Sequence, residues 1–254
     1  MENRYGRLAA WVYDLDKPVG RSFGDIAYYA GRLEGCRGPV LEPAVGNGRL
    51  FIPLLELGLD LTGFDASAEM LDRCRAHCRE RGLAPALSCQ RFETFDCAQQ
   101  FEAIILPAGS FQLIADFARA RVTLQRFLAH LAPGGRLIMD IDAAGALITA
   151  QGGVRSWRFA EDELITLTEQ PLATDFVAQT THAFLRYEHW RDGRLAGAEL
   201  ERFSLRWWGV EELVMLLRET GFVDVTVSAD YRHCAVPEAT ASTITFEAHR
   251  PGAR

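Results

Sequence analysis

The sequence predicts an α/β fold in which a doubly wound, mostly parallel sheet carries an inserted antiparallel β cap. Between positions 40 and 141, short apolar runs alternate with helical patterns, an arrangement typical of parallel sheets that helices cover on both faces. A glycine-rich turn follows the first apolar run. After Ala150, polar and apolar residues alternate, which is the period of antiparallel strands with one solvated face.

The N-terminal stretch, positions 1–35, has an aromatic-rich helical pattern that is interrupted at Lys17-Pro18. Proline lacks an amide donor and restricts the residue before it, so we expect at least two short helices here. These helices are expected either to form a lid over a ligand or simply to pack against the sheet.

The glycine turn lies inside a predicted βαβ unit. Val40 begins a short strand, Gly46-Asn47-Gly48 form the turn, and a helical pattern leads to a second strand that ends at Asp65. Amides at such a turn can approach a ligand closely, and the helix that follows favours negative charge. A dinucleotide fingerprint would need a small residue where this chain has Phe51. The Asp65 carboxylate can accept both hydroxyls of a ribose, so we predict a nucleotide site at this turn.

The same pattern continues to position 141. Ser67 is suited to cap the next helix, because its side chain can accept a hydrogen bond from a first-turn amide, and Gly82 is suited to end that helix. The elements that follow are predicted as strands at Leu87–Arg91 and Ala103–Leu106, a helix at Ala118–Leu131 and a fifth strand at Leu137–Ile141.

The alternation after Ala150 predicts a small antiparallel sheet beside the parallel one. Asp192-Gly193 lies between two of its runs, and both residues tolerate the positive φ of a tight hairpin turn. The predicted strands are Val154–Phe159, Leu164–Glu169, Phe176–Trp190 and Leu195–Trp207, followed by a helix at Glu211–Glu219 that Gly221 ends and by an edge hairpin of Val223–Val227 and Ser242–Ala248. No repeat or linker divides the sequence, so we expect one domain over residues 1–254, with a helical lid at 1–35 and an acceptor cap at 150–207.

Composition narrows the classes of partner. The net charge of -7 argues against a nucleic acid as the main partner, because phosphate neutralisation needs a basic face. The first sixteen residues carry scattered charges and no long apolar run, so we expect neither a signal peptide nor a membrane span. The six cysteines lack the paired spacing of zinc sites. We therefore expect a cytoplasmic monomer or homodimer with reduced thiols, no metal, no membrane partner and no nucleic acid.

Four motifs, in order and spacing, resemble the class I S-adenosylmethionine-dependent methyltransferases of the small-molecule type. They are Leu41–Arg49, Gly63–Leu71, Leu106–Phe111 and Leu131–Leu137. The resemblance spans about Val40 to Ile141. It implies the Rossmann-like fold of that family and methyl transfer from S-adenosylmethionine to an N or O atom of a small-molecule acceptor, with S-adenosylhomocysteine as the product.

The resemblance also implies which residues bind the cofactor. The glycine turn would admit the methionine portion, Asp65 would hold the ribose, and the residues after the second and third strands would lie near the adenine. The implied set is Glu42, Ala44, Gly46, Gly48, Arg49, Asp65, Ala66, Met70, Phe92, Leu106 and Ala108. Arg91 departs from the family pattern, which often has an Asp there to meet the adenine amino group. Arginine cannot accept that hydrogen bond.

The acceptor site is far less defined by the sequence. Methyl transfer depends mainly on positioning, so no catalytic motif is required. Tyr13 and Tyr28 are candidates to cover the sulfonium and orient the acceptor, Gln112 to contact it, and His182 to act as a base. Arg186 and Arg206 belong to a locally basic insertion that would suit an acidic group on the acceptor. Core packing or a solvated strand face remains an alternative for each of these residues.

Two other functions stay open on the sequence alone. An NAD-dependent oxidoreductase would share the βαβ unit, although Phe51 counts against it. A non-catalytic protein that binds S-adenosylmethionine is the second, and Arg91 keeps it open.

Overall fold

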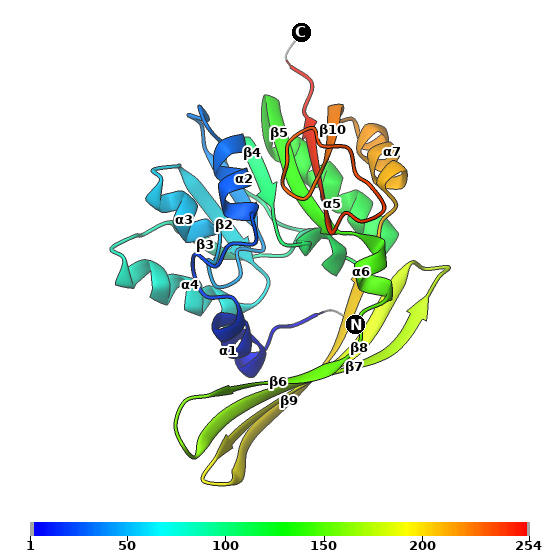
Figure 1. Cartoon of the computed structure of the whole chain (residues 1–254). Coiled ribbons are helices and arrows are strands. Elements are labelled where there is room, and N and C mark those ends of the chain that lie inside the picture. Colours follow the sequence, from blue (N-terminus) through cyan, green and yellow to red (C-terminus); the bar gives the residue numbers. More distant parts are fainter. Residues whose placement is uncertain (1–2, 253–254) are drawn as a thin grey trace.

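The computed structural model describes residues 3–252, and its larger sheet has seven strands in the spatial order β10-β11-β5-β4-β1-β2-β3 (Figure 1). β1 to β5 pair in parallel, whereas β11 is antiparallel to β5 and to β10. The strands are β1 (Val40–Pro43), β2 (Leu61–Asp65), β3 (Ala86–Cys89), β4 (Phe101–Leu106), β5 (Leu131–Asp142), β10 (Val223–Ala229) and β11 (Thr243–His249). This confirms the predicted mostly parallel sheet and its edge hairpin.

Helices cover both faces of this sheet, as the prediction of a doubly wound fold requires. One apolar cluster joins the sheet to α5 and α7, and a second joins the opposite face to α2, α3 and α4. The helices are α1 (Arg7–Asp16), α2 (Asp25–Arg32), α3 (Phe51–Glu56), α4 (Ala68–Glu80), η1 (Ser110–Leu113), α5 (Phe117–His130), α6 (Ala144–Ile148) and α7 (Val210–Thr220).

β4 shows why its sequence is a continuous apolar run. Ile104 and Leu106 lie in the cluster with α5, and Ala103 and Ile105 lie in the cluster on the other face. All four are fully buried. Because successive side chains of a strand point to opposite faces, a strand covered on both sides must be apolar at every position.

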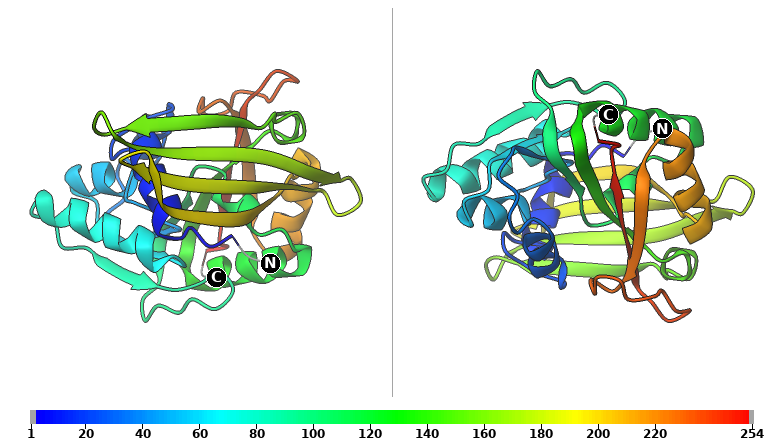
Figure 2. Two further views of the ribbon diagram at one scale, coloured as in Figure 1. Left: turned by 90° about the horizontal axis from the view of Figure 1, so that it is seen from below. Right: turned by 90° about the horizontal axis from the view of Figure 1, so that it is seen from above.

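The inserted sheet lies across one end of the parallel sheet (Figures 1 and 2). Its four antiparallel strands are β6 (Gly153–Arg158), β7 (Glu163–Asp175), β8 (Thr180–Arg191) and β9 (Arg194–Arg206), in that spatial order. The turn between β8 and β9 is Asp192-Gly193, with φ of 52° and 68°, as the sequence predicts. α1 lies between the two sheets (Figure 1) and packs its apolar face on β7 and β8.

Three details differ from the sequence prediction. Phe176 does not begin a strand, because the Asp175 carboxylate accepts the amides of Val177 and Ala178 and closes a turn there. β4 and the strands of the insertion are shifted by one to a few residues, and β7 runs six residues further than predicted. β5 begins at Leu131, six residues before the predicted start at Leu137. The short helix α6 was not predicted. In contrast, the break at Lys17-Pro18 does separate two helices, α1 and α2.

No helix within residues 3–252 is long and apolar enough to cross a membrane.

Candidate active site

A cavity of about 400 Å³ lies where the carboxyl ends of β1, β2, β4 and β5 face the inserted sheet. This edge of a parallel α/β sheet is where ligands bind in such folds. Nine of the residues predicted for the cofactor or the acceptor line the cavity: Tyr13, Ala44, Gly46, Asp65, Ala66, Met70, Phe92, Ala108 and Gln112.

The turn after β1 is held by Asp65. Asp65 Oδ2 accepts the Gly46 amide at 2.9 Å, and Oδ1 accepts the Ser67 amide at 2.8 Å. Burial raises the pKa of the Asp65 carboxyl, and these amides oppose that rise. The turn needs this support because Ala44 has a φ of 56°, a left-handed conformation that residues with a side chain rarely adopt. Each carboxylate oxygen keeps a further acceptor position for a ligand in the cavity.

The two glycines of this turn have different roles. A Cβ on Gly46 would meet only Tyr13, at 3.9 Å, so the missing side chain keeps the cavity open. A Cβ on Gly48 would lie 2.8 Å from Ile52 Cδ1 and 2.9 Å from Cys74 Sγ. Gly48 is therefore required by the packing of α3 and α4, and it does not line the cavity.

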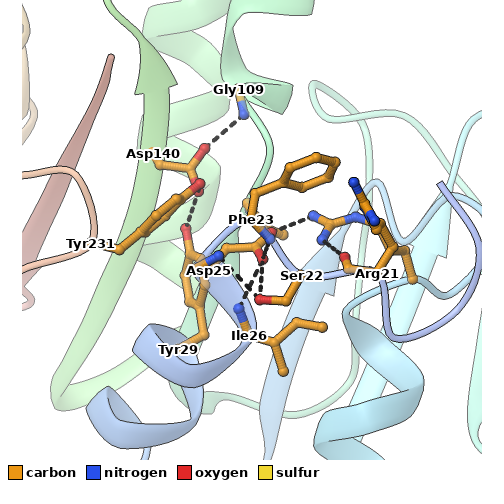
Figure 3. A network of polar contacts seen from close by, with 12 residues as sticks. Arg21, Ser22, Phe23, Asp25, Ile26, Tyr29, Gly109, Asp140 and Tyr231 are labelled. Atoms are coloured by element: carbon orange, nitrogen blue, oxygen red, sulfur yellow. Dashed lines mark hydrogen bonds and ion pairs between the residues drawn. The ribbon is translucent and has the colours of Figure 1, made fainter. Parts of the chain in front are cut away.

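The turn after β4 is held by a second carboxylate, on β5. Asp140 accepts the Gly109 amide at 2.7 Å, the Tyr29 hydroxyl at 2.9 Å and the Tyr231 hydroxyl at 3.2 Å (Figure 3). Asp140 is fully buried, and burial raises its pKa to about 6. The sequence analysis did not single out this residue.

The first residues of the chain close one side of the cavity. We call Asn3–Tyr5 the N-terminal strap. Asn3 exchanges two hydrogen bonds of 2.9 Å with the Ser204 backbone on β9, and Glu201 of β9 accepts the amides of the next two strap residues. On the other side, the Ser67 hydroxyl donates to the Tyr5 carbonyl at 2.8 Å. The strap therefore joins the inserted sheet to the N-terminus of α4.

Four residues predicted for the cofactor lie outside the cavity. Glu42 and Leu106 are buried beneath it, and Gly48 packs against helices. Arg49 forms a buried ion pair of 2.5 Å with Asp25 of α2 and donates to the Arg21 carbonyl at 2.7 Å. Burial raises the pKa of the Glu42 carboxyl, and its Oε2 has no hydrogen-bond partner among the described residues.

Four residues predicted for the acceptor also lie outside the cavity. Tyr28 is within hydrogen-bond distance of the Thr245 hydroxyl, 3.1 Å away. His182 contacts the Ser204 hydroxyl at 2.8 Å, and burial lowers its pKa. Arg186 is exposed on the outer side of β8 beside Glu188, and Arg206 is buried against Glu212 and the Trp208 ring. None of the four lines the cavity.

Gln112 lines the cavity, but its side chain is already engaged. Its amide donates to the Asp142 carbonyl at 3.1 Å and its Oε1 accepts the Asp142 amide at 2.8 Å. Gln112 therefore fixes the end of β5. Asp142 and Lys17 also line the cavity, and the sequence analysis missed both. Asp142 ends a parallel strand as Asp65 does, and that signal was available.

Comparisons with known proteins agree with this geometry. Residues 40–135 match the family described as "Methyltransferase domain". The glycine/sarcosine N-methyltransferase of Parasynechococcus marenigrum (strain WH8102) is 28% identical over 91% of this chain and 77% of that protein. The enzyme of the same name from Halorhodospira halochloris is 35% identical over a segment that covers 40% of this chain and 38% of that protein.

The fold is also that of a solved sugar N-methyltransferase, KedS8 from Streptoalloteichus sp ATCC 53650. The TM-score is 0.75, with 19% identity and coverage of 94% of this chain and 92% of that chain. Residues 40–135 therefore carry a methyltransferase domain, and the whole chain has the fold of solved S-adenosylmethionine-dependent methyltransferases. The resemblance inferred from the four sequence motifs is thereby confirmed.

Proposed function

We propose that this methyltransferase transfers the methyl group of S-adenosylmethionine to a nitrogen atom of a small amine, with S-adenosylhomocysteine as the product. The observation that carries the donor assignment is Asp65, whose carboxylate faces the cavity from the end of β2. The choice of nitrogen over oxygen is supported by two similar proteins that are named as glycine/sarcosine N-methyltransferases.

The residues around the cavity fit the donor. Asp65 has acceptor positions for ribose hydroxyls, and the space left by Gly46 would admit the methionine portion beside Ala44 and Ala108. The apolar side chains of Ala66, Met70 and Phe92 line the same cavity and would flank the adenine. Because Arg91 stands at the usual acidic position, we propose that backbone groups contact the adenine edge. The bound donor would supply an electrophilic methyl group on a sulfonium.

The protein itself would position the donor and the acceptor and would exclude water from the site. The N-terminal strap and β9 cover the cavity from the side opposite the parallel sheet, and excluding water strengthens electrostatic contacts inside. Tyr13 lines the cavity next to Gly46, and burial raises its pKa while Arg49 opposes that rise. A neutral Tyr13 hydroxyl would orient the acceptor.

We further propose that residues 1–254 act as one methyltransferase domain, with 1–35 as the lid and 150–207 as the acceptor cap. The packing of α1 between the two sheets supports this assignment. The net charge of -7 supports a small-molecule acceptor rather than a nucleic acid. A cytoplasmic monomer or homodimer stays a prediction.

Calorimetry with S-adenosylmethionine, S-adenosylhomocysteine and NAD tests the donor assignment. We expect both adenosyl compounds to bind and NAD not to bind. A labelled-methyl assay on glycine, sarcosine and glucosamine, with mass analysis, then tests the acceptor. Transfer to oxygen only would overturn the choice of nitrogen, and tight S-adenosylhomocysteine binding without transfer to any acceptor would favour a non-catalytic binding protein.

A further inference from the structure

Asp142 presents a carboxyl group to the cavity. Its backbone is fixed by Gln112, but among residues 3–252 its carboxylate oxygens have neither a hydrogen bond nor an ion pair. The side chain is open to the cavity, and the surrounding protein raises its pKa. A partly desolvated carboxylate without a partner is unfavourable unless a ligand supplies a cation or a donor.

The charge of Lys17 opposes the rise in the pKa of the Asp142 carboxyl. Lys17 and Asp142 both line the cavity, and no ion pair joins the two side chains within the part of the chain that the structure describes. The ammonium lies 5.1 Å from the centre of the Tyr13 ring. The cavity therefore holds two opposite charges that a ligand can approach separately.

The position of Asp142 separates it from the proposed ribose site. Asp65 ends β2 and Asp142 ends β5, and β1 and β4 lie between these strands. At about 4.8 Å per strand, the two strands are roughly 14 Å apart. Asp142 Oδ2 lies 3.3 Å from the place where a Cβ of Gly109 would be, so the missing side chain leaves it uncovered. Asp142 thus lies beyond the proposed ribose site, next to the turn after β4.

We propose that Asp142 binds the ammonium group of the acceptor and so selects cationic amines over neutral or acidic acceptors. This inference rests on the proposed N-methyltransferase function and adds the residue that recognises the substrate. Asp142 acts here as a specificity-determining group, through an ion pair made in the space next to Gly109. The bound ammonium loses one proton to solvent before its lone pair attacks the sulfonium methyl group, and the methylated product again carries the positive charge. Anionic acceptors would be repelled by the same carboxylate.

Two ligands test this without knowledge of the natural acceptor. Sinefungin carries an ammonium-bearing carbon where S-adenosylhomocysteine carries the sulfur, and the two are otherwise alike. In Asp142→Asn, which is nearly isosteric, we expect sinefungin to bind about ten-fold more weakly. S-adenosylhomocysteine should bind within two-fold of its wild-type affinity. Calorimetry gives both constants, and thermal unfolding checks that the variant is folded.

Asp116→Asn is the matched control. Asp116 lines the same cavity but accepts the Arg119 amide at the start of α5, a cap that asparagine also provides. The control removes one negative charge from the cavity, and both affinities should stay within two-fold of wild type.

The results of these titrations distinguish a wrong role for Asp142 from a wrong proposed function. Equal weakening of both ligands in Asp142→Asn would assign the carboxylate to the ammonium of the cofactor's methionine portion and overturn the proposal. Equal effects in the two variants would show a general charge effect and also overturn it. Unchanged sinefungin binding in Asp142→Asn would refute the recognition role alone, whereas a wild-type protein that binds neither ligand would refute the proposed function.

The amine that the wild-type enzyme methylates gives a second readout. In Asp142→Asn we expect its KM to rise about ten-fold, with a smaller change in kcat, because the ion pair is made in the bound ground state as well as in the transition state. A fall in kcat at constant KM would contradict recognition.

Discussion

The turns after β1 and β4 have the same local structure, but the carboxylate that holds the first turn lines the cavity and the one that holds the second is buried. In each, an alanine has a left-handed φ, 56° at Ala44 and 59° at Ala108, and a following glycine donates its amide to a carboxylate on the neighbouring strand. Asp65 of β2 holds the first turn and Asp140 of β5 holds the second. Asp65 lines the cavity, whereas Asp140 is fully buried.

This difference in burial separates a carboxylate that can bind a ligand from one that only supports the fold. Asp65 has two backbone donors and remains open to a ligand. Asp140 has one backbone donor and two tyrosine hydroxyls that come from α2 and from the segment between β10 and β11. The first carboxylate would serve the cofactor, while the second ties three distant parts of the chain to the turn after β4 (Figure 3).

α2 is attached to both turns. Its first residue, Asp25, pairs with Arg49 just after the first turn, and Tyr29, one helical turn later, donates to Asp140 below the second. The helix predicted as a lid is therefore part of the support of the site. Variants that break its contacts should destabilise the protein before they alter ligand contacts.

The largest expected effect is the loss of stability when the ion pair between Asp25 and Arg49 is broken. The two side chains are only 1% and 4% exposed, and removing one partner of a buried pair leaves an uncompensated charge. Asp25→Ala should lower the free energy of unfolding by about 3–5 kcal/mol, measured by denaturant titration. Asp25→Asn can still accept the amides of Phe23 and Ile26, so it isolates the loss of charge. A loss below 1 kcal/mol in both variants would mean that the pair does not secure α2.

The second effect is the contribution of Asp140 to the pH dependence of the free energy of unfolding. Its folded pKa of about 6 lies above the unfolded value of about 3.9, so the folded state binds the proton more tightly. This contribution is fully present below pH 4 and is lost as the pH rises to 6. Since each pKa unit corresponds to about 1.4 kcal/mol, the loss is about 3 kcal/mol.

Asp140→Asn has no such proton to lose. The difference in unfolding free energy between wild type and Asp140→Asn should therefore change by about 3 kcal/mol between pH 4 and pH 7, with wild type relatively weaker at pH 7. A difference that is flat with pH would show that Asp140 is ionised at the same pH in both states. S-adenosylhomocysteine affinity at pH 7 should change much less than in an Asp65 variant.

The sequence predicted both turns, but it revealed only the carboxylate that supports the first turn and missed Asp140, which supports the second, for a physical reason. Gly46, Asp65 and the elements around them are close in sequence, so spacing alone defines a βαβ site. Asp140, Tyr29 and Tyr231 are brought together only by the order of β5, β4 and the C-terminal hairpin, and an aspartate inside a strand carries no local signal of its partners. The same holds for Glu201, which binds the strap from about 200 residues away.

Tertiary contacts that the sequence does not reveal decide where single side chains point. Arg206 lies in a basic stretch of the sequence, yet it is engaged by Glu212 and the Trp208 ring. Gly48 matches the cofactor motif, but packing against Ile52 explains it. Asp142 was the one missed residue that strand-end position could have revealed, because it ends β5 as Asp65 ends β2.

The third effect is on binding at the first turn. Asp65→Ala should weaken S-adenosylhomocysteine by about 1–3 kcal/mol, or roughly 5- to 150-fold, because ligand hydroxyls and the Gly46 amide lose their acceptor. Calorimetry measures this change. If Asp65→Ala binds with the wild-type dissociation constant, the ribose assignment is wrong and the two turns are both scaffolds.

The smallest losses of stability should come from removing the hydroxyls of the two tyrosines that donate to Asp140. Comparing the two losses tests which tyrosine holds the turn after β4 more strongly. Tyr29 is fully buried and donates at 2.9 Å, whereas Tyr231 is partly exposed and donates at 3.2 Å. At pH 7, where Asp140 is ionised, Tyr29→Phe should cost about 1.5 kcal/mol and Tyr231→Phe about 0.5 kcal/mol in denaturant titrations, since water can replace only the exposed donor. Equal costs would mean that the C-terminal segment holds this turn as firmly as α2, and a larger cost for Tyr231→Phe would move the main support of the turn from the N-terminal helix to the chain's final hairpin.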